Sequence, residues 1–218
     1  MTYHTISNGL RRVFVIGSNG GTPVQVSPGT APDERNGNWS PDGKNIAWIV
    51  QYAVSTVLRW RDQRIQVATR DGRGGWSAPS TVAFNGLLLT PAWSDSGTAL
   101  IGIDSSMSYV SQPIAGGVSR RISGPVKDEW LPSGNASGMV SSDGTTTYFL
   151  NYSGVRSGVV VALRLTDGKV REVLRFDEAA RPHSNASIGI AENAGWMYFT
   201  LSDLQSDIWV AKVTGLKQ

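Results

Sequence analysis

The side chains best suited to bind another molecule lie in four long segments between predicted strands. Arg59, Trp60 and Arg61 stand next to one another in the segment 51–63. An exposed tryptophan flanked by arginines can stack on a base, a sugar or an aromatic side chain. The alternative is a long hairpin in which Trp60 packs on neighbouring structure and the arginines are solvated. With both interpretations open, the three residues are candidate binding residues.

The other three segments supply four more candidates. Arg35 lies in 29–37, Lys127 and Trp130 lie in 124–136, and His183 lies in 177–186. Lys127 and Trp130 combine a charge with a large apolar anchor, although such a loop can also simply pack on the protein. His183 could be a general base only beside a nucleophile and an orienting carboxylate. A solvated or capping histidine is the simpler interpretation.

The sequence indicates a protein without catalytic machinery. It contains no G-x-S-x-G elbow, no H-E-x-x-H, no G-x-x-x-x-G-K-[ST] and no EF-hand loop. The absence of cysteine excludes structural disulfides and thiolate metal sites, and two histidines leave little room for a histidine-based metal site. Asp42, Asp95, Asp143 and Asp167 have too few oxygen neighbours for calcium and are expected in turns. We predict no catalytic residue, no metal and no cofactor.

The charge balance and the hydropathy of the chain argue against a nucleic-acid partner and against a membrane span. Twenty basic residues oppose seventeen acidic ones spread along the 218-residue chain, so a polyanion such as nucleic acid is not the expected partner. No apolar run approaches the ~20 residues that span a bilayer. The N-terminal sequence MTYHTISNGLRR lacks the order of a secretion signal. Either the protein is cytoplasmic or the chain begins downstream of its signal.

An internal repeat determines the expected fold. Four segments align: NWSPDGKNIAWIV at 38–50, PAWSDSGTALIGID at 91–104, GMVSSDGTTTYFLN at 138–151 and IGIAENAGWMYFTL at 188–201. Their turn glycines, Gly43, Gly97, Gly144 and Gly195, are spaced by 54, 47 and 51 residues. Aspartate and glycine at these places are typical of hairpin turns. The apolar run after each turn does not alternate, which predicts a strand buried on both faces.

A second strand, glycine turn and strand follow in most units, and no segment shows sustained helical periodicity. Four antiparallel strands in each repeat of about fifty residues predict an all-β fold, a β-propeller with four-stranded blades. We expect a single domain over 1–218 with four to five blades. A partial blade covers 3–28, and the others cover about 33–83, 86–123, 136–176 and 187–213. The ring either closes with N-terminal strands beside the last blade or belongs to a larger propeller.

The sequence WSPDGKNIA at 39–47 resembles the repeat of TolB-type propellers, whose units run W-S-P-D-G-K-x-I-A. The equivalents WSDSG at 93–97, SSDG at 141–144 and AENAG at 191–195 are progressively degraded. The resemblance implies a bacterial propeller of a group that includes adaptors, sensors and lids on peptidases. It favours an extracytoplasmic location, periplasmic or secreted, over a cytoplasmic one.

Three functions follow as hypotheses. The first is a non-catalytic scaffold that binds a protein or peptide through the face carrying the long segments, since long loops on a rigid scaffold often carry binding sites. The second is a regulatory or substrate-gating propeller of a larger enzyme, such as a kinase or an oligopeptidase. The third is a structural subunit that assembles with other copies of itself through open blade edges.

Overall fold

The computed structural model describes residues 1–31, 33–51, 63–83, 87–94, 97–126, 138–141, 144–152, 158–176, 190–193, 196–201 and 207–212. Every regular element in these ranges is a β-strand. The all-β fold expected from the repeat is therefore confirmed. In the same ranges, no helix has the length and hydropathy to cross a bilayer.

The N-terminal strands form two units joined in one sheet. The first is a three-stranded meander, and the second is a four-stranded antiparallel unit in chain order. A single parallel bridge, Arg11 opposite Asp33, connects them. The meander contains β1 (Thr2–Ser7), β2 (Leu10–Gly17) and β3 (Gly20–Gln25), and the four-stranded unit contains β4 (Asp33–Trp39), β5 (Asn45–Gln51), β6 (Gln63–Thr69) and β7 (Ser80–Val82).

Three further antiparallel sheets follow in chain order. The second sheet contains β8 (Leu87–Trp93), β9 (Ala99–Ile103), β10 (Ser108–Pro113) and β11 (Arg120–Pro125). The third contains β12 (Gly138–Val140), β13 (Thr146–Tyr152), β14 (Gly158–Arg164) and β15 (Val170–Phe176). The fourth contains β16 (Ile190–Asn193), β17 (Trp196–Leu201) and β18 (Asp207–Lys212).

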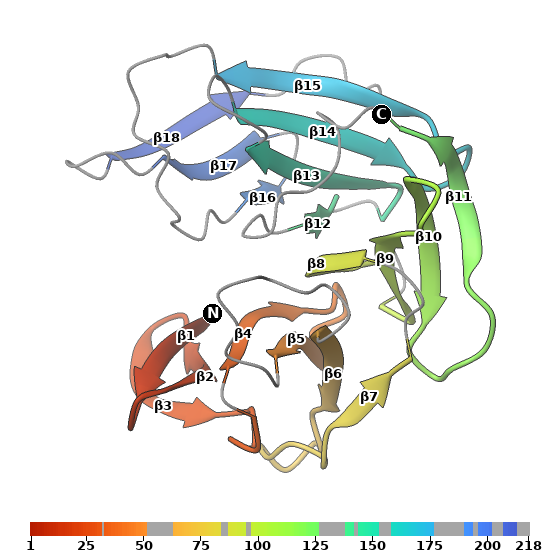
Figure 1. Ribbon diagram of the computed structural model, residues 1–218. Helices are drawn as coiled ribbons and strands as arrows, with labels where there is room; N and C mark the ends of the chain where they lie inside the picture. The colour runs from red at the N-terminus through yellow and green to blue at the C-terminus, as the bar shows by residue number, and fades with distance from the viewer. Residues whose placement is uncertain are drawn as a thin grey trace.

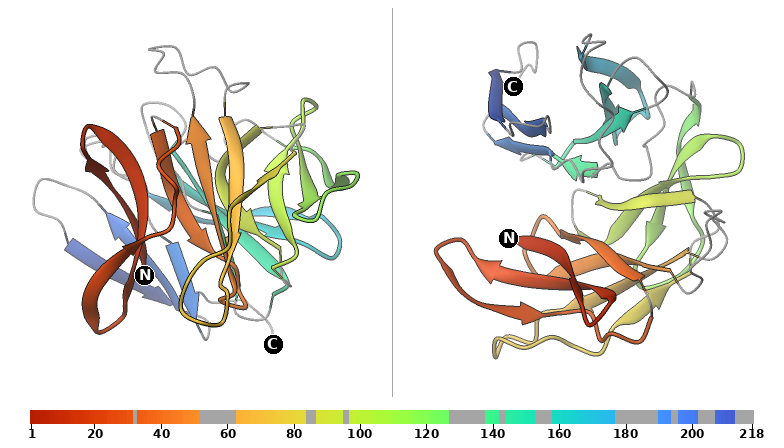
Figure 2. Two further views of the ribbon diagram at one scale, coloured as in Figure 1. Left: turned by 90° about the horizontal axis from the view of Figure 1, so that it is seen from below. Right: turned by 60° about the vertical axis from the view of Figure 1, so that its left-hand side comes forward.

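The sheets follow one another along an arc, from the red N-terminal strands to the blue C-terminal ones (Figure 1). The first strand of each four-stranded unit, and of the three-stranded fourth sheet, lies innermost: β4 contacts β8, β8 contacts β12, and β12 contacts β16. Figure 2 shows the same succession from two other sides. Radially arranged four-stranded sheets with their first strands at the centre are the blades of a β-propeller.

The hydrophobic core lies between successive sheets, as the non-alternating strands predict. In β5, Ile46, Trp48 and Val50 pack towards the meander, whereas Ala47 and Ile49 pack with Trp93 and Leu100 of the second sheet. Because neighbouring residues of a strand point to opposite faces, an apolar run buries both. The five consecutive side chains from Ile46 to Val50 have no solvent exposure.

The aligned repeats predict a buried position for ten aromatic and aliphatic residues, and seven of them are buried in the structure. They are Ile46, Trp48, Trp93, Leu100, Ile101, Tyr148 and Phe149. Trp39 is only half-buried, because it ends β4 at the rim of the core, where it packs against Trp76 at 5.3 Å between ring centroids. The side chains of Tyr198 and Phe199 fall outside the described residues.

A serine organises the turn between the first two strands of each of the three four-stranded units. The hydroxyl oxygens of Ser40, Ser94 and Ser141 accept a hydrogen bond from the amide five residues later, at 2.9, 3.2 and 3.0 Å. Each serine carbonyl also accepts the amide of the turn glycine at 2.9 Å. Gly43 and Gly144 have φ of 69° and 71°, as a glycine turn requires. The repeated motif is therefore a repeated hydrogen-bond pattern.

Candidate functional site

Two kinds of connection emerge at opposite ends of the strands. Since the strands of a unit are antiparallel, the links from second to third strand and from each unit to the next leave at one end, which we call the long-loop face. The turns from first to second and from third to fourth strand leave at the other end, the short-turn face. The longest link on the short-turn face is 70–79, held by hydrogen bonds from Arg73 and Gly75 amides to the Asp71 carboxylate.

Of the predicted binding residues, the structure describes Arg35. Arg59, Trp60, Arg61, Lys127, Trp130 and His183 lie outside the described residues. Arg35 belongs to β4, the innermost strand of its unit, near the end of that strand at the long-loop face. Its guanidinium donates a hydrogen bond of 3.1 Å to the side-chain oxygen of Gln51 at the end of β5. Arg35 therefore belongs to the folded scaffold and is 13% exposed.

Arg35 is part of a charged cluster that joins two units. The Asp33 carboxylate lies 3.7 Å from the guanidinium of Arg35 and 3.5 Å from that of Arg11 on β2. Two guanidinium groups thus share one carboxylate. The cluster keeps an excess positive charge beside a partly buried surface, where a further carboxylate would be attracted.

His4 adds a group that can change its charge. Burial of the imidazole and the nearby positive charge of Arg11 lower the pKa of His4 below its usual value. Asp33 raises this pKa and Arg35 lowers it, and both effects are smaller. The imidazole is therefore neutral near pH 7 and leaves the positive charge of the cluster to the two arginines.

Several polar atoms at the start of β4 are buried without a hydrogen bond. Within the described part of the chain they are Asp33 Oδ1, Glu34 Oε1, Arg35 Nε and Asn36 Nδ2. Buried polar atoms without partners are rare in folded proteins. Their concentration in four consecutive residues distinguishes this place from the rest of the scaffold.

Sequence reasoning identified Arg35 but missed Arg11, Asp33 and Gln51. Asp33 and Gln51 are partners in the β4–β5 register, and Arg11 lies opposite Asp33 through the bridge between β2 and β4. Correct pairing of β4 with β5 could have indicated that Gln51 lies beside Asp33 and Arg35. The contact between Arg11 and Asp33 depends on how the meander packs beside the first four-stranded unit, and no local sequence pattern specifies this packing.

Asp104, at the end of β9 on the same face, has a structural role. Its carboxylate accepts hydrogen bonds from the amides of Ser106 and Ser108, at 2.8 and 3.1 Å, and from Arg121 at 2.8 Å. Partial burial raises its pKa, but these hydrogen bonds and that of the Ser106 hydroxyl outweigh burial and lower the pKa to about 2. The carboxylate therefore holds a closed turn. No group of three or more potential metal ligands occurs among the described residues.

Comparison with solved structures places the fold. No family model matches the chain, and no curated protein does. TolB from Acinetobacter baumannii superimposes with a TM-score of 0.64 over 99% of this chain and 51% of its own, at 14% identity. A chain of the nidogen/laminin complex matches with a TM-score of 0.51 over 81% of this chain and 57% of its own, at 16% identity.

A puromycin-hydrolysing peptidase from Mycobacterium tuberculosis is a third match, with a TM-score of 0.57 and 18% identity. The alignment covers 96% of this chain and 32% of the peptidase. The chain thus spans about half the length of the TolB structure and about a third of the peptidase. At these identities the likeness concerns the fold alone: the chain has a β-propeller fold similar to that of TolB.

Proposed function

We propose that this protein is a non-catalytic scaffold that binds a protein or peptide through its long-loop face. The observation that supports it most is the cluster of Arg11, Asp33 and Arg35, with its buried unpaired polar atoms, at the start of β4. A partner that presents a carboxylate could accept hydrogen bonds from the accessible part of the two guanidinium groups, of which that of Arg11 belongs to a side chain 43% exposed. Burial strengthens such a charge-assisted hydrogen bond.

The segments that carry Trp60 and Trp130 leave the scaffold at the same face as this cluster, because 51–63 links β5 to β6 and 124–136 links β11 to β12. Tryptophan and arginine are enriched among residues that dominate binding energy. We therefore propose that the arginines of the cluster orient an acidic partner segment, and that the two tryptophans contribute apolar contact area. The match to a chain of the nidogen/laminin complex adds an example of a related fold crystallised in a protein complex. We further propose an extracytoplasmic location.

The test is binding of a partner, first captured by the wild-type protein and then purified. Arg35→Ala and the double variant Trp60→Ala with Trp130→Ala should each weaken its affinity by tenfold or more, as expected for central interface residues. Arg73→Ala, on the short-turn face, is the matched control and should bind as the wild type does. Equal affinity of all three variants would exclude the long-loop face as the binding surface.

A second candidate is a gating or regulatory propeller of a larger enzyme. The observation that favours it is the match to about a third of a peptidase chain. The test is the coding sequence on both sides of this chain. A kinase domain upstream, or a hydrolase domain with its serine elbow downstream, would establish this role in place of an independent scaffold.

A third candidate is self-assembly through strand edges. Among the described strands, β18 pairs with β17 and β1 pairs with β2, so each has one paired edge. An open edge can accept a strand of another copy. Sedimentation over a hundredfold range of concentration should then reveal association, and a constant monomer would exclude it.

A further inference from the structure

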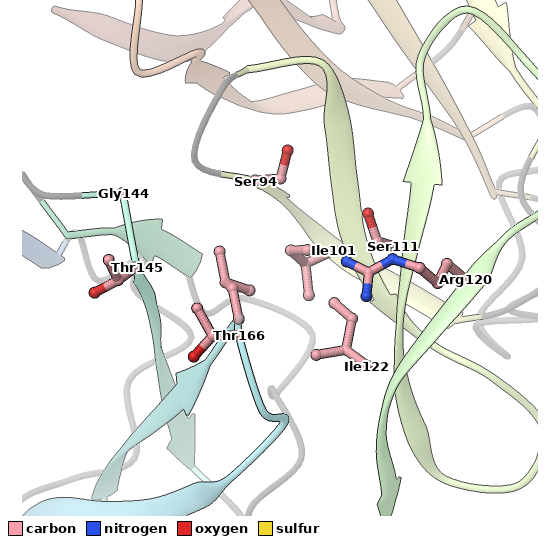
Figure 3. Close-up of a pocket in the computed structure, with 9 residues that line it drawn as sticks. Ser94, Ile101, Ser111, Arg120, Ile122, Gly144, Thr145 and Thr166 are labelled. Carbon is pink, nitrogen blue, oxygen red and sulfur yellow. The ribbon is translucent and has the colours of Figure 1, made fainter.

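A pocket lies between the second and third sheets, on the short-turn face opposite the charged cluster (Figure 3). Its volume is about 150 Å³. The second sheet supplies Ile101, Ser111 and Arg120, and the turns of the third sheet supply Thr145 and Thr166. Hydroxyl groups and one guanidinium thus surround a space whose floor is the apolar core between two blades.

One wall of the pocket is a row across three strands. Ser111 of β10 is in register with Ile101 of β9 on one side and with Arg120 of β11 on the other. Residues in register on adjacent strands stand on the same face of a sheet. Figure 3 shows the guanidinium of Arg120 reaching across this row, between Ile101 and Ile122.

The positive charge of Arg120 has no counterion in the described residues. Arg121, its neighbour in β11, points to the other face and pairs with Asp104 at 2.8 Å. Arg120, in contrast, makes no ion pair and no side-chain hydrogen bond with any residue that the structure describes, and neither does the hydroxyl of Ser111. Both groups can therefore bind a ligand without first breaking an internal contact.

The same place between the first and second sheets carries no charge and has an apolar residue where Ser111 stands in the second sheet. Counted from the turn serines, Ala47, Val67 and Ser80 hold the positions of the three residues of the row. Val67 is buried there, and Ile114 of the next sheet packs against its cluster. Blade packing therefore does not require a serine and an arginine at this position. The third sheet has Tyr148, Ala162 and Arg171 in the same row, so among the described sheets the combination of a serine with an arginine is particular to the second sheet.

We propose that this pocket binds a small carboxylate that carries a short aliphatic group, as a peptide ending in leucine does. Arg120 pairs with the carboxylate, since guanidinium and carboxylate form two parallel hydrogen bonds. The hydroxyl of Ser111 donates a further hydrogen bond, and Ile101 and Ile122 contact the aliphatic group. A water takes about 30 Å³ of liquid, so the pocket has room for a carboxylate and a short aliphatic group but not for a large ring.

The binding test uses N-acetyl-L-leucine, isovalerate and N-acetyl-L-leucinamide, titrated into the complete protein and followed by NMR chemical shifts. The acids should bind with a Kd of about 1–10 mM, as expected for ligands of this size, and the amide at least tenfold more weakly. Tighter binding of N-acetyl-L-leucine identifies a peptide terminus as the ligand, and tighter or equal binding of isovalerate identifies a free acid. Failure of both acids to saturate, or equal binding of the amide, would overturn the proposal.

Variants locate the ligand. Arg120→Gln should weaken binding of the acids by tenfold or more, because it removes the charged partner. Arg120→Lys should retain part of the affinity, since it keeps the charge without the paired donors. Arg121→Gln, adjacent but pointing to the other face, is the matched control and should bind as the wild type does. Wild-type affinity in a folded Arg120→Gln protein would refute the site. Because the pocket lies on the short-turn face, the outcome of this test does not depend on whether the long-loop face binds a partner.

Discussion

The Nη1 atom of Arg12 lies 3.7 Å from the Oε2 atom of Glu34, and the two side chains are 7% and 0% exposed. The pair joins β2 of the N-terminal meander to β4 of the first four-stranded unit. Arg12 also donates to the carbonyl of Ala31 at 2.8 Å, and Glu34 accepts the amide of Gly29 at 3.0 Å. The pair and its hydrogen bonds therefore hold the link between β3 and β4 against both units.

Removal of one member of this pair should be strongly destabilising. Glu34→Ala leaves the guanidinium of Arg12 buried without its counterion, and loss of one partner of a buried ion pair costs roughly 3–5 kcal/mol. Urea unfolding would measure this free energy. Asp167→Ala removes the exposed ion pairs with Arg164 and Lys169 and a turn hydrogen bond from the Lys169 amide. It serves as a control with a much smaller expected loss of stability. Similar losses for the two variants would show that the buried pair has no special role.

Phe149 should be a principal residue of the second interface between blades. It is 3% exposed and stacks on Tyr109 of the neighbouring sheet, with 5.1 Å between ring centroids. Phe149→Ala should lower the free energy of unfolding by ~3–5 kcal/mol, because it leaves a cavity between two sheets. Phe149→Leu should cost less, and equal effects of the two substitutions in urea unfolding would argue against a cavity.

Two turn glycines should differ in their tolerance of alanine, although both have positive φ. At Gly43 (φ 69°) an added Cβ meets nothing within 4 Å. At Gly168 (φ 68°) it would lie 2.8 Å from the carbonyl carbon of Ile122 and 3.0 Å from the Cα of Ser123. Gly43→Ala should therefore cost about 1 kcal/mol for the backbone conformation alone.

Gly168→Ala should cost ~1–3 kcal/mol more than Gly43→Ala, because the Cβ would push apart the second and third sheets. Thermal unfolding of the two variants under the same conditions provides the comparison. Equal melting temperatures would mean that the turn of the third sheet does not pack against β11 as closely as described.

The depressed pKa of Asp104 makes its contribution to stability dependent on pH. Its pKa is lowered from 3.8 to about 2 in the folded protein. The ionised carboxylate therefore stabilises the fold fully above the unfolded pKa, and this stabilisation is lost as the pH falls through the interval to about 2. Wild-type protein should be more stable than Asp104→Asn at about pH 6, and the difference should shrink towards about pH 2. A difference that stays constant in urea unfolding over this range would contradict the assignment.

The repeat pattern determined the class of fold. The segment around Ser40 and Gly43 specifies its own turn, because each hydrogen bond that forms the turn joins residues at most five positions apart. The apolar run at 46–50 likewise specifies a strand with two buried faces. Such interactions are local and recur in each four-stranded unit, so the sequence predicts a blade without knowledge of the other blades.

The tertiary structure decided which side chains meet. Arg35 was a candidate from its segment, but its position beside Asp33 and Arg11 depends on the bridge between β2 and β4. The half-buried position of Trp39 depends on the packing of Trp76 at the rim. Arg120 faces turn residues of the next sheet, which follow it in the chain by more than twenty positions. These contacts are set by strand register and by the packing of one sheet on another, and both are products of the complete chain rather than of any short segment.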